Sequence, residues 1–241
     1  MRGDKALFNK EYLNEISAQY GIELSKEALE KFSVYSDFLR EYNEKVNLTA
    51  ITDENEIAVK HFLDSMLLLK VLNKKDISIA DVGAGAGFPS VPFLIANNKA
   101  SLYAIEPNNK RVEFLNQLSE KIKLPFEARH IRAEEAGRNA EYRENFDVVT
   151  ARAVKEMREL SELCLPLVKV GGVFAALKGP DISEEIEGAK NAIRLLGGQL
   201  EEISEFTLPD GAKRNIVLVK KISHTSAKYP RMYAKIKKNP L

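Results

Sequence analysis

The glycine-rich stretch 81–89 contains the residues of this chain best suited to binding a small ligand. It follows the apolar run 77–82 and has glycine at every second position, namely Gly83, Gly85 and Gly87. Glycines let a ligand lie against bare backbone at a helix N-terminus. Glu106 ends the next apolar run, and its carboxylate can accept hydrogen bonds from both hydroxyls of a ribose. Phe88 and Ser90 stand where G-x-G-x-x-G needs glycine, so the spacing does not favour a pyrophosphate-binding site. A tight strand-to-helix turn without a ligand is the alternative.

The rest of the sequence predicts the scaffold for this loop. From residue 77 onward, apolar runs alternate with helical patterns, as in proteins with parallel strands and right-handed crossovers. Strands are predicted at 77–82, 101–106, 126–131, 146–151, 172–178, 200–207 and 214–222, and helices at 89–97, 108–122, 156–168 and 181–196. The turn sequence Leu-Pro-Asp-Gly at 208–211 predicts a hairpin, and therefore a doubly wound seven-stranded α/β sheet whose last strand pair is antiparallel.

The chain is predicted to have three parts. Apolar residues spaced by three and four over 10–70 predict an N-terminal helical appendage, which we place at 1–72. The ligand-binding α/β domain is placed at 73–222, and a basic tail at 223–241. Ligands of such sheets bind outside the carboxyl ends of the strands. The candidates there, after the second to fifth strands in turn, are Lys110 and Arg111, Ala133 and Glu134, Arg152, and Lys178.

Composition and charge narrow the class of protein. The single cysteine, Cys164, excludes an internal disulfide framework, and its apolar helical context predicts a buried structural thiol. No apolar stretch suits a membrane span or signal sequence, so we expect a cytoplasmic protein without membrane association, and we predict no metal site. The net charge is +1, yet the 31 residues after Asp210 contain nine bases and no acid. This basic end suggests a polyanionic partner, with a solubilising tail as the alternative.

Six short motifs occur in the order found in one known family. They are Asn-Leu-Thr-Ala-Ile at 47–51, His-Phe-Leu-Asp-Ser at 61–65, the glycine loop at 81–89, Thr-Ala-Arg-Ala-Val at 150–154, Arg-Asn-Ile at 214–216 and Lys-Tyr-Pro-Arg at 228–231. The glycine loop with Glu106 resembles motif I of class I S-adenosylmethionine-dependent methyltransferases, and the whole set resembles the glucose-inhibited division protein B family. The resemblance implies a monomer that uses S-adenosylmethionine to methylate guanine N7 in 16S ribosomal RNA of the small ribosomal subunit, at guanine 527 in the 530 loop.

The resemblance also implies roles for individual residues. Those matching the family's cofactor contacts are Gly83, Phe88, Ala133, Glu134 and Arg152, to which the wider class pattern adds Gly85, Gly87 and Glu106. Candidate RNA contacts are Lys110, Arg111, Lys178, Arg214, Lys228 and Arg231. The stretch 232–236 departs from the family, which usually has a Gly-Thr-Pro-containing segment there.

The chemistry of guanine N7 suits a site without a general base, because N7 has a lone pair and no proton. The protein must mainly align N7 with the methyl group and exclude water. We therefore expect Arg152 to act by positioning, through the cofactor's carboxylate or through guanine O6 and phosphate, with an ion pair to Glu134 as the alternative. The nearby pattern of His61, Asp64 and Ser65 is interpreted as a local hydrogen-bonded cluster rather than a site.

Two absences after the fourth predicted strand support a ring nitrogen as methyl acceptor. The sequence there has neither the Asp/Asn-Pro-Pro-aromatic motif of exocyclic-amine methylases nor the cysteine of C5-pyrimidine methylases. The remaining alternatives are a methyltransferase acting on another RNA or on a small molecule, and a non-catalytic module that binds nucleotides or RNA.

Overall fold

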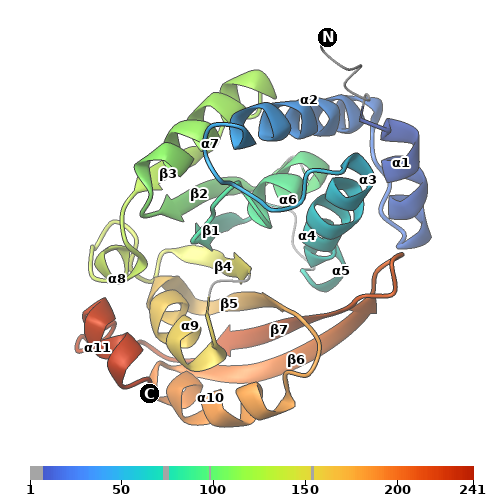
Figure 1. Cartoon of the computed structure of the whole chain (residues 1–241). Helices are drawn as coiled ribbons and strands as arrows, with labels where there is room; N and C mark the ends of the chain where they lie inside the picture. The colour runs from blue at the N-terminus through green and yellow to red at the C-terminus, as the bar shows by residue number, and fades with distance from the viewer. Residues whose placement is uncertain (1–7, 73–75, 98, 153–154) are drawn as a thin grey trace.

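Seven strands form one mixed sheet at the centre of the protein (Figure 1). The computed structural model describes residues 8–72, 76–97, 99–152 and 155–241. The strands are β1 Ser78–Val82, β2 Ser101–Glu106, β3 Glu127–His130, β4 Phe146–Arg152, β5 Val168–Lys178, β6 Gly198–Thr207 and β7 Lys213–Lys221. Their order is β3-β2-β1-β4-β5-β7-β6, and β7 runs antiparallel to both of its neighbours while the other pairs are parallel. The doubly wound sheet with an antiparallel last pair is therefore confirmed.

Burial on both faces explains why the central strands read as apolar runs in the sequence. In β1, the residues from Ile79 to Val82 are at most 2% exposed. The β6–β7 hairpin closes as predicted, with the Leu208 N–H donating to Ala212 O at 2.9 Å and Gly211 at φ +82°. β5 begins four residues earlier than predicted, because it continues through Gly171 and Gly172 beside a register irregularity in its pairing with β4.

One face of the sheet is covered by the N-terminal helices together with two helices of the α/β units. The N-terminal elements are α1 Lys10–Gln19, α2 Lys26–Asn43, α3 Glu54–Glu56, the π-helix η1 Ile57–Leu63, α4 Asp64–Met66 and α5 Leu68–Val71. Asn9 and Ser25 cap the first two helices, each accepting a backbone N–H through its side chain. These elements share one hydrophobic core with the sheet and with α6 Ser90–Asn97 and α7 Asn109–Lys121. The helical appendage is thus packed into the same body as the sheet.

The opposite face is covered by α8 Ala133–Ala136, α9 Met157–Cys164, the 3₁₀ turn η2 Leu165–Leu167, α10 Ser183–Leu195 and α11 Tyr233–Lys238. Cys164 is buried there, as predicted, and burial raises the pKa of its thiol well above the ordinary value. The segment 223–241 is docked against this face, with Tyr229 and Ile236 buried (Figure 1).

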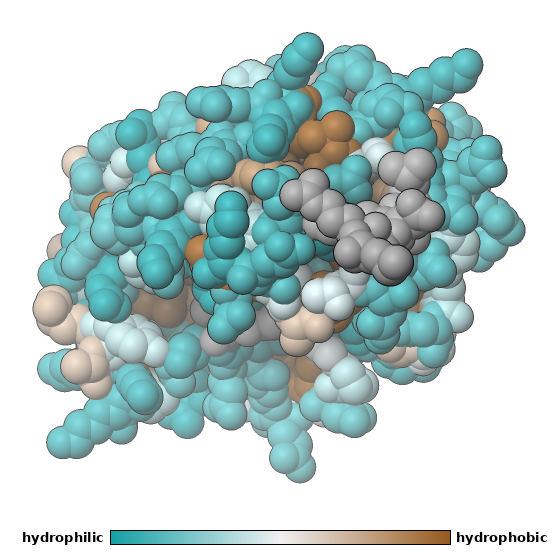
Figure 2. All heavy atoms as spheres, turned by 45° about the horizontal axis from the view of Figure 1, so that its top comes forward, coloured by the Kyte–Doolittle hydropathy of each residue, from teal (hydrophilic) through white to brown (hydrophobic). Residues whose placement is uncertain are grey.

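One face of the molecule is predominantly polar. Figure 2 shows one face on which hydrophilic side chains predominate and hydrophobic ones form only small patches. Among the described residues, no helix is both long and apolar enough to cross a membrane. Residues 1–7 and the last two positions of the 150–154 motif lie outside the described residues.

Candidate functional site

The glycine loop follows β1 and is held in place by hydrogen bonds from its own backbone. Gly83 has φ +72° and donates its N–H to Ile105 O at 2.9 Å. Gly85 donates to Glu106 Oε2 at 2.8 Å, and the Asn108 N–H donates to Glu106 Oε1 at 2.9 Å. Glu106 is only 2% exposed. In this structure its carboxylate therefore fastens the loop to the end of β2, and each oxygen retains further acceptor capacity for a ligand hydroxyl.

The N-terminal helices also support this loop. The Tyr35 hydroxyl, on α2, donates to Ala86 O, and the Tyr35 ring is stacked with the ring of Phe88 at 5.5 Å between centroids. Gly87 has φ +95°, and a Cβ there would lie 2.8 Å from both Tyr35 Oη and Val91 Cγ2. Glycine at 87 is therefore required by the packing of α2 against the loop.

Asp81, at the start of the glycine motif, is a buried carboxylate. It is 0% exposed, and Ser90 Oγ donates to its Oδ2 at 2.5 Å. Its Oδ1 has no hydrogen-bond partner within the described part of the chain. Burial, partly offset by Ser90, raises the pKa of Asp81 to about 7. A buried acceptor without a partner is uncommon in folded proteins, and Asp81 lines neither of the two cavities described below.

A cavity of about 240 Å³ lies at the carboxyl ends of β1 and β2, and we call it the donor cavity. Its lining residues are Val82, Gly83, Ile105, Pro107, Arg132, Ala133, Glu134, Lys155, Leu163 and Tyr233. Three predicted cofactor residues, Gly83, Ala133 and Glu134, are thus brought together. Arg132, Lys155 and Tyr233 were not predicted to lie there.

The other predicted cofactor residues do not belong to this lining. Gly85, Gly87 and Glu106 shape the loop behind the cavity. Phe88 is 6% exposed and is packed between Tyr35, His61 and Arg152, so it fills the corner between β1 and α6. Contacts of these four residues with a cofactor stay predictions.

A second cavity, of about 430 Å³, lies at the carboxyl ends of β4 and β5, and we call it the cationic cavity. Its lining residues are Ile51, Lys60, His61, Asp64, Arg152, Leu177, Lys178, Gly179 and Arg214. Four cationic side chains face one carboxylate in this lining. The cavity therefore favours an anionic ligand or one rich in hydrogen-bond acceptors.

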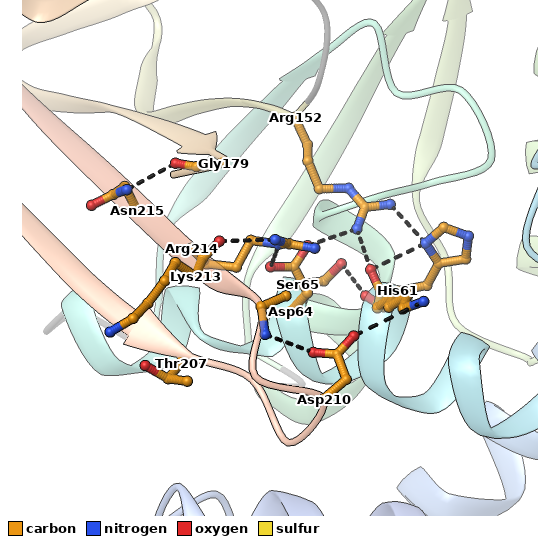
Figure 3. A network of polar contacts seen from close by, with 12 residues as sticks. His61, Asp64, Ser65, Arg152, Gly179, Thr207, Asp210, Lys213, Arg214 and Asn215 are labelled. Atoms are coloured by element: carbon orange, nitrogen blue, oxygen red, sulfur yellow. Dashed lines mark hydrogen bonds and ion pairs between the residues drawn. The ribbon is translucent and has the colours of Figure 1, made fainter. Parts of the chain in front are cut away.

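Arg152 is fixed by three contacts to the N-terminal helical elements (Figure 3). Its Nη1 donates to Asp64 Oδ2 and to Lys60 O, each at 3.0 Å, and its Nη2 donates to His61 Nδ1 at 3.2 Å. Its Cζ also lies 4.8 Å from the centroid of the Phe88 ring. The ion-pair partner of Arg152 is therefore Asp64, and the predicted alternative of a pair with Glu134 was wrong, because Glu134 lines the donor cavity instead.

His61 is held neutral. Burial, followed by the adjacent Arg152 guanidinium, lowers the pKa of His61 to about 3. Its Nδ1 lies 3.2 Å from both Arg152 Nη2 and Lys60 O, and its Nε2 lies 2.8 Å from Thr49 Oγ1. Asn43 Oδ1 in turn accepts from the Thr49 N–H at 3.0 Å, so the 47–51 motif positions His61.

Asp64 connects two arginines. Besides Arg152, its Oδ1 lies 3.3 Å from Arg214 Nε on β7, and the residue is only 4% exposed. Burial raises the pKa of Asp64, and the two guanidinium groups offset only part of this effect. His61 and Asp64 were assigned to a local cluster, and the structure instead places both at the cationic cavity. Ser65 donates to His61 O at 2.5 Å and is 0% exposed, so it has a structural contact.

The predicted RNA-contact residues fall into two groups. Lys178 and Arg214 line the cationic cavity, while Lys110 and Lys228 are exposed and Arg111 is half-buried on the surface. Arg231 is different, because its guanidinium forms a bidentate ion pair with the fully buried Glu162, at 2.6 Å from Nη2 to Oε2. Arg231 therefore anchors the C-terminal segment, and its contact with RNA stays a prediction.

No metal site accompanies these cavities in the part of the chain that the structure describes, where no group of three or more His, Cys, Asp or Glu could hold an ion.

Solved structures of proteins in complex with AdoMet or SFG share this fold. The chain is similar to M. jannaschii TYW2, solved in complex with AdoMet, with 18% identity, a TM-score of 0.52, and coverage of 67% of this chain and 76% of that one. It is also similar to NSun6 from Pyrococcus horikoshii, solved with SFG, with 16% identity, a TM-score of 0.54, and coverage of 67% of this chain and 52% of that one. Together with the sheet order, these likenesses show the fold of the class I methyltransferases.

Comparison with sequence families is more specific. The family model of rRNA small subunit methyltransferase G matches residues 28–217. Two curated relatives bear the name ribosomal RNA small subunit methyltransferase G. The one from Acetivibrio thermocellus is 43% identical over 240 residues, and the match covers 99% of both chains. The one from Bacillus cytotoxicus is 48% identical over 226 residues, and the match covers 92% of this chain and 95% of that relative. The chain belongs to the rRNA small subunit methyltransferase G family, as the order of its motifs predicted.

Proposed function

We propose that this protein transfers the methyl group of S-adenosylmethionine to N7 of a guanine in 16S ribosomal RNA. The observation that carries the proposal is the cationic cavity, where Arg152, Arg214 and the neutral His61 surround a space at the sheet edge next to the glycine loop. Arginine side chains bind guanine through its N7 and O6 acceptors, and both relatives are named for methylation of small-subunit RNA. The 530 loop, at guanine 527, is the proposed position.

The residues around the donor cavity fit S-adenosylmethionine. Gly83 offers bare backbone, and Ala133 and Glu134, the first two residues of α8, also line the cavity. Glu106 retains acceptor capacity for the ribose hydroxyls. When bound, the donor supplies a methyl group on a sulfonium, which is already activated for transfer.

The protein's own contribution is to position the acceptor. Guanine N7 needs no deprotonation, so the site needs no general base, and His61 could not serve as a general acid because it stays neutral. Arg152 is oriented by Asp64, His61 and Lys60 O, and its guanidinium lines the cavity as a donor for guanine O6 or phosphate. Holding the base in line with the methyl group supplies the rate enhancement.

The polyanionic substrate matches the distribution of cationic side chains, two of which are ion-paired in this structure, Lys178 with Glu185 and Arg214 with Asp64. Lys178 and Arg214 at the cationic cavity, with Lys110, Arg111 and Lys228 on the surface, would bind RNA phosphates. We place the protein in the cytoplasm, where ribosomal subunits are assembled, acting as a monomer.

The test uses small ribosomal subunits, and separately extracted 16S RNA, from cells that lack this protein. Each is incubated with purified protein and S-adenosylmethionine carrying a deuterated methyl group. The RNA is then digested to nucleosides, which are separated and identified by mass spectrometry. The proposal predicts deuterated 7-methylguanosine from at least one of the two substrates. Label in a different nucleoside, or none from either substrate, would refute it.

A further inference from the structure

The C-terminal segment 223–241 contributes a side chain to the donor cavity. Tyr233, the first residue of α11, lines this cavity together with Gly83, Ala133 and Glu134. Its ring lies beside Lys155, whose Nζ is 5.5 Å from the ring centroid. The other lining residues come from the strand ends, α8 and α9, so Tyr233 is brought to the cavity from a distant part of the sequence.

Ion pairs and hydrogen bonds hold the segment in place on either side of Tyr233. Two residues before it, the Arg231 side chain and backbone N–H both bond to Glu162 of α9, which is 0% exposed. After it, Ile236 is 0% exposed, and Arg158 donates from Nε to Leu241 O at 2.6 Å. The position of the Tyr233 ring is therefore fixed by packing rather than left to a free tail.

The segment is also joined directly to the end of α8, which carries the cavity residues Ala133 and Glu134. Arg143 Nη1 donates to both Gly137 O, at 2.7 Å, and Tyr229 O, at 2.8 Å. A Cβ on Gly137 would lie 2.9 Å from Pro230 Cγ, so the end of α8 and the C-terminal segment are in close contact. The wall formed by α8 and the wall formed by α11 are thus parts of one packed unit.

We propose that the C-terminal segment forms one wall of the donor pocket, and that the Tyr233 ring lies against the adenine of the donor. This inference rests on the proposed function for the identity of the donor. An aromatic ring facing a cavity that is otherwise lined largely by apolar groups and bare backbone suits a flat heteroaromatic base. The basic segment then has a role in donor binding in addition to its charge.

The test is calorimetric binding of S-adenosylhomocysteine and, separately, of adenosine to the full-length protein. Because Tyr233→Ala removes the base–aromatic contact, it should raise the Kd for both probes about tenfold. Tyr233→Phe, which keeps the ring, should stay within about threefold of wild type by the same reasoning. Met232→Ala is the matched control, since Met232 is the neighbouring residue, 70% exposed and outside the cavity lining, and it should not change either Kd.

The melting temperature of each variant without ligand shows whether it is folded. If Tyr233→Ala does not fold, Tyr233→Leu keeps apolar bulk without a π face and should still weaken both probes. Unchanged affinity of a folded Ala or Leu variant for both probes would overturn the proposal. Weakened S-adenosylhomocysteine binding with unchanged adenosine binding would overturn the adenine contact. A wild-type protein that binds neither probe would refute the proposed function itself, which is a distinct outcome.

Discussion

Replacing Asp64 by Asn tests whether the positioning of Arg152 controls methyl transfer. Asp64 is 4% exposed, accepts from Arg152 at 3.0 Å and lies 3.3 Å from Arg214, so the change removes the negative charge between two arginines while keeping the shape. A charge-assisted hydrogen bond contributes about 1.5–3 kcal/mol, and the amide oxygen preserves a weaker neutral one. We therefore expect a loss of about 2 kcal/mol, or roughly 30-fold in turnover.

The assay is transfer of tritiated methyl groups to small subunits, with kcat and KM determined separately for RNA and donor. Turnover should fall, while KM for S-adenosylmethionine stays within about twofold and RNA binding does not weaken, because the cationic cavity becomes more positive. The melting temperature should fall by about 4–8 °C for a protein of this size. Asp210→Asn is the control, since Asp210 is an exposed carboxylate on the neighbouring hairpin. Turnover within twofold of wild type for Asp64→Asn would refute the positioning role.

Three further predictions concern the loop, the buried carboxylate and the RNA surface. Gly87→Ala should destabilise the fold by about 2–4 kcal/mol, because φ is +95° and the Cβ would lie 2.8 Å from Tyr35 Oη; chemical denaturation measures this, and an unchanged midpoint would contradict it. The pKa of Asp81 is raised from 3.8 to about 7, so between these pH values the donor-free native state holds a proton that the unfolded state has lost. Stability should therefore fall as pH rises from about 4 to 7, and Asp81→Asn should remove this part of the dependence of melting temperature on pH. An identical pH dependence in the variant would exclude Asp81 as its origin. Arg214→Gln should reduce the slope of log binding constant against log salt concentration, for a 16S fragment, by about one unit. Lys220→Gln is the control, since Lys220 lies at the opposite end of the strands, and it should leave the slope unchanged. Equal slopes in both variants would remove Arg214 from the RNA surface.

The order of elements could be predicted because local signals encode it. Apolar runs covered on both faces, helical spacing and the 208–211 turn are properties of neighbouring residues, and they yielded seven strands in the right pattern. The predicted helix bounds were wrong where one local signal competes with another. The helix predicted at 156–168 ends at Cys164, because Pro166 lacks an N–H and a 3₁₀ turn follows. The π-helix at 57–63 has no sequence signal of this kind.

The site could be predicted only in part, because its contacts join distant segments. Arg152 was identified from its place after the fourth strand, but its partner Asp64 is 88 residues away and belongs to the N-terminal helices. The spacing of His61 and Asp64 on one helical turn was the available signal, and their link to Arg152 needed the tertiary packing. Tyr233 had no signal at all, since neither composition nor periodicity shows where a C-terminal segment docks.

Charge in the last 31 residues, 211–241, illustrates the same limit. Nine bases without an acid suggested a polyanion partner, yet two of them are internal. Arg231 pairs with Glu162, and Lys221 is 1% exposed with its Nζ 3.1 Å from Glu144 Oε1. Burial, partly offset by Glu144, lowers the pKa of Lys221 to about 8. Because a sequence does not show which cations are neutralised inside the fold, net charge overstated the RNA-binding surface of this segment.

The most direct test is a crystal structure of the protein with S-adenosylhomocysteine and a short guanosine-containing RNA. The adenine should lie in the donor cavity near Gly83 and Glu134, and a guanine should lie in the cationic cavity with its N7 directed toward the sulfur and its O6 or phosphate within hydrogen-bond distance of Arg152. A guanine bound elsewhere, with Arg152 still occupied only by Asp64 and His61, would contradict the account.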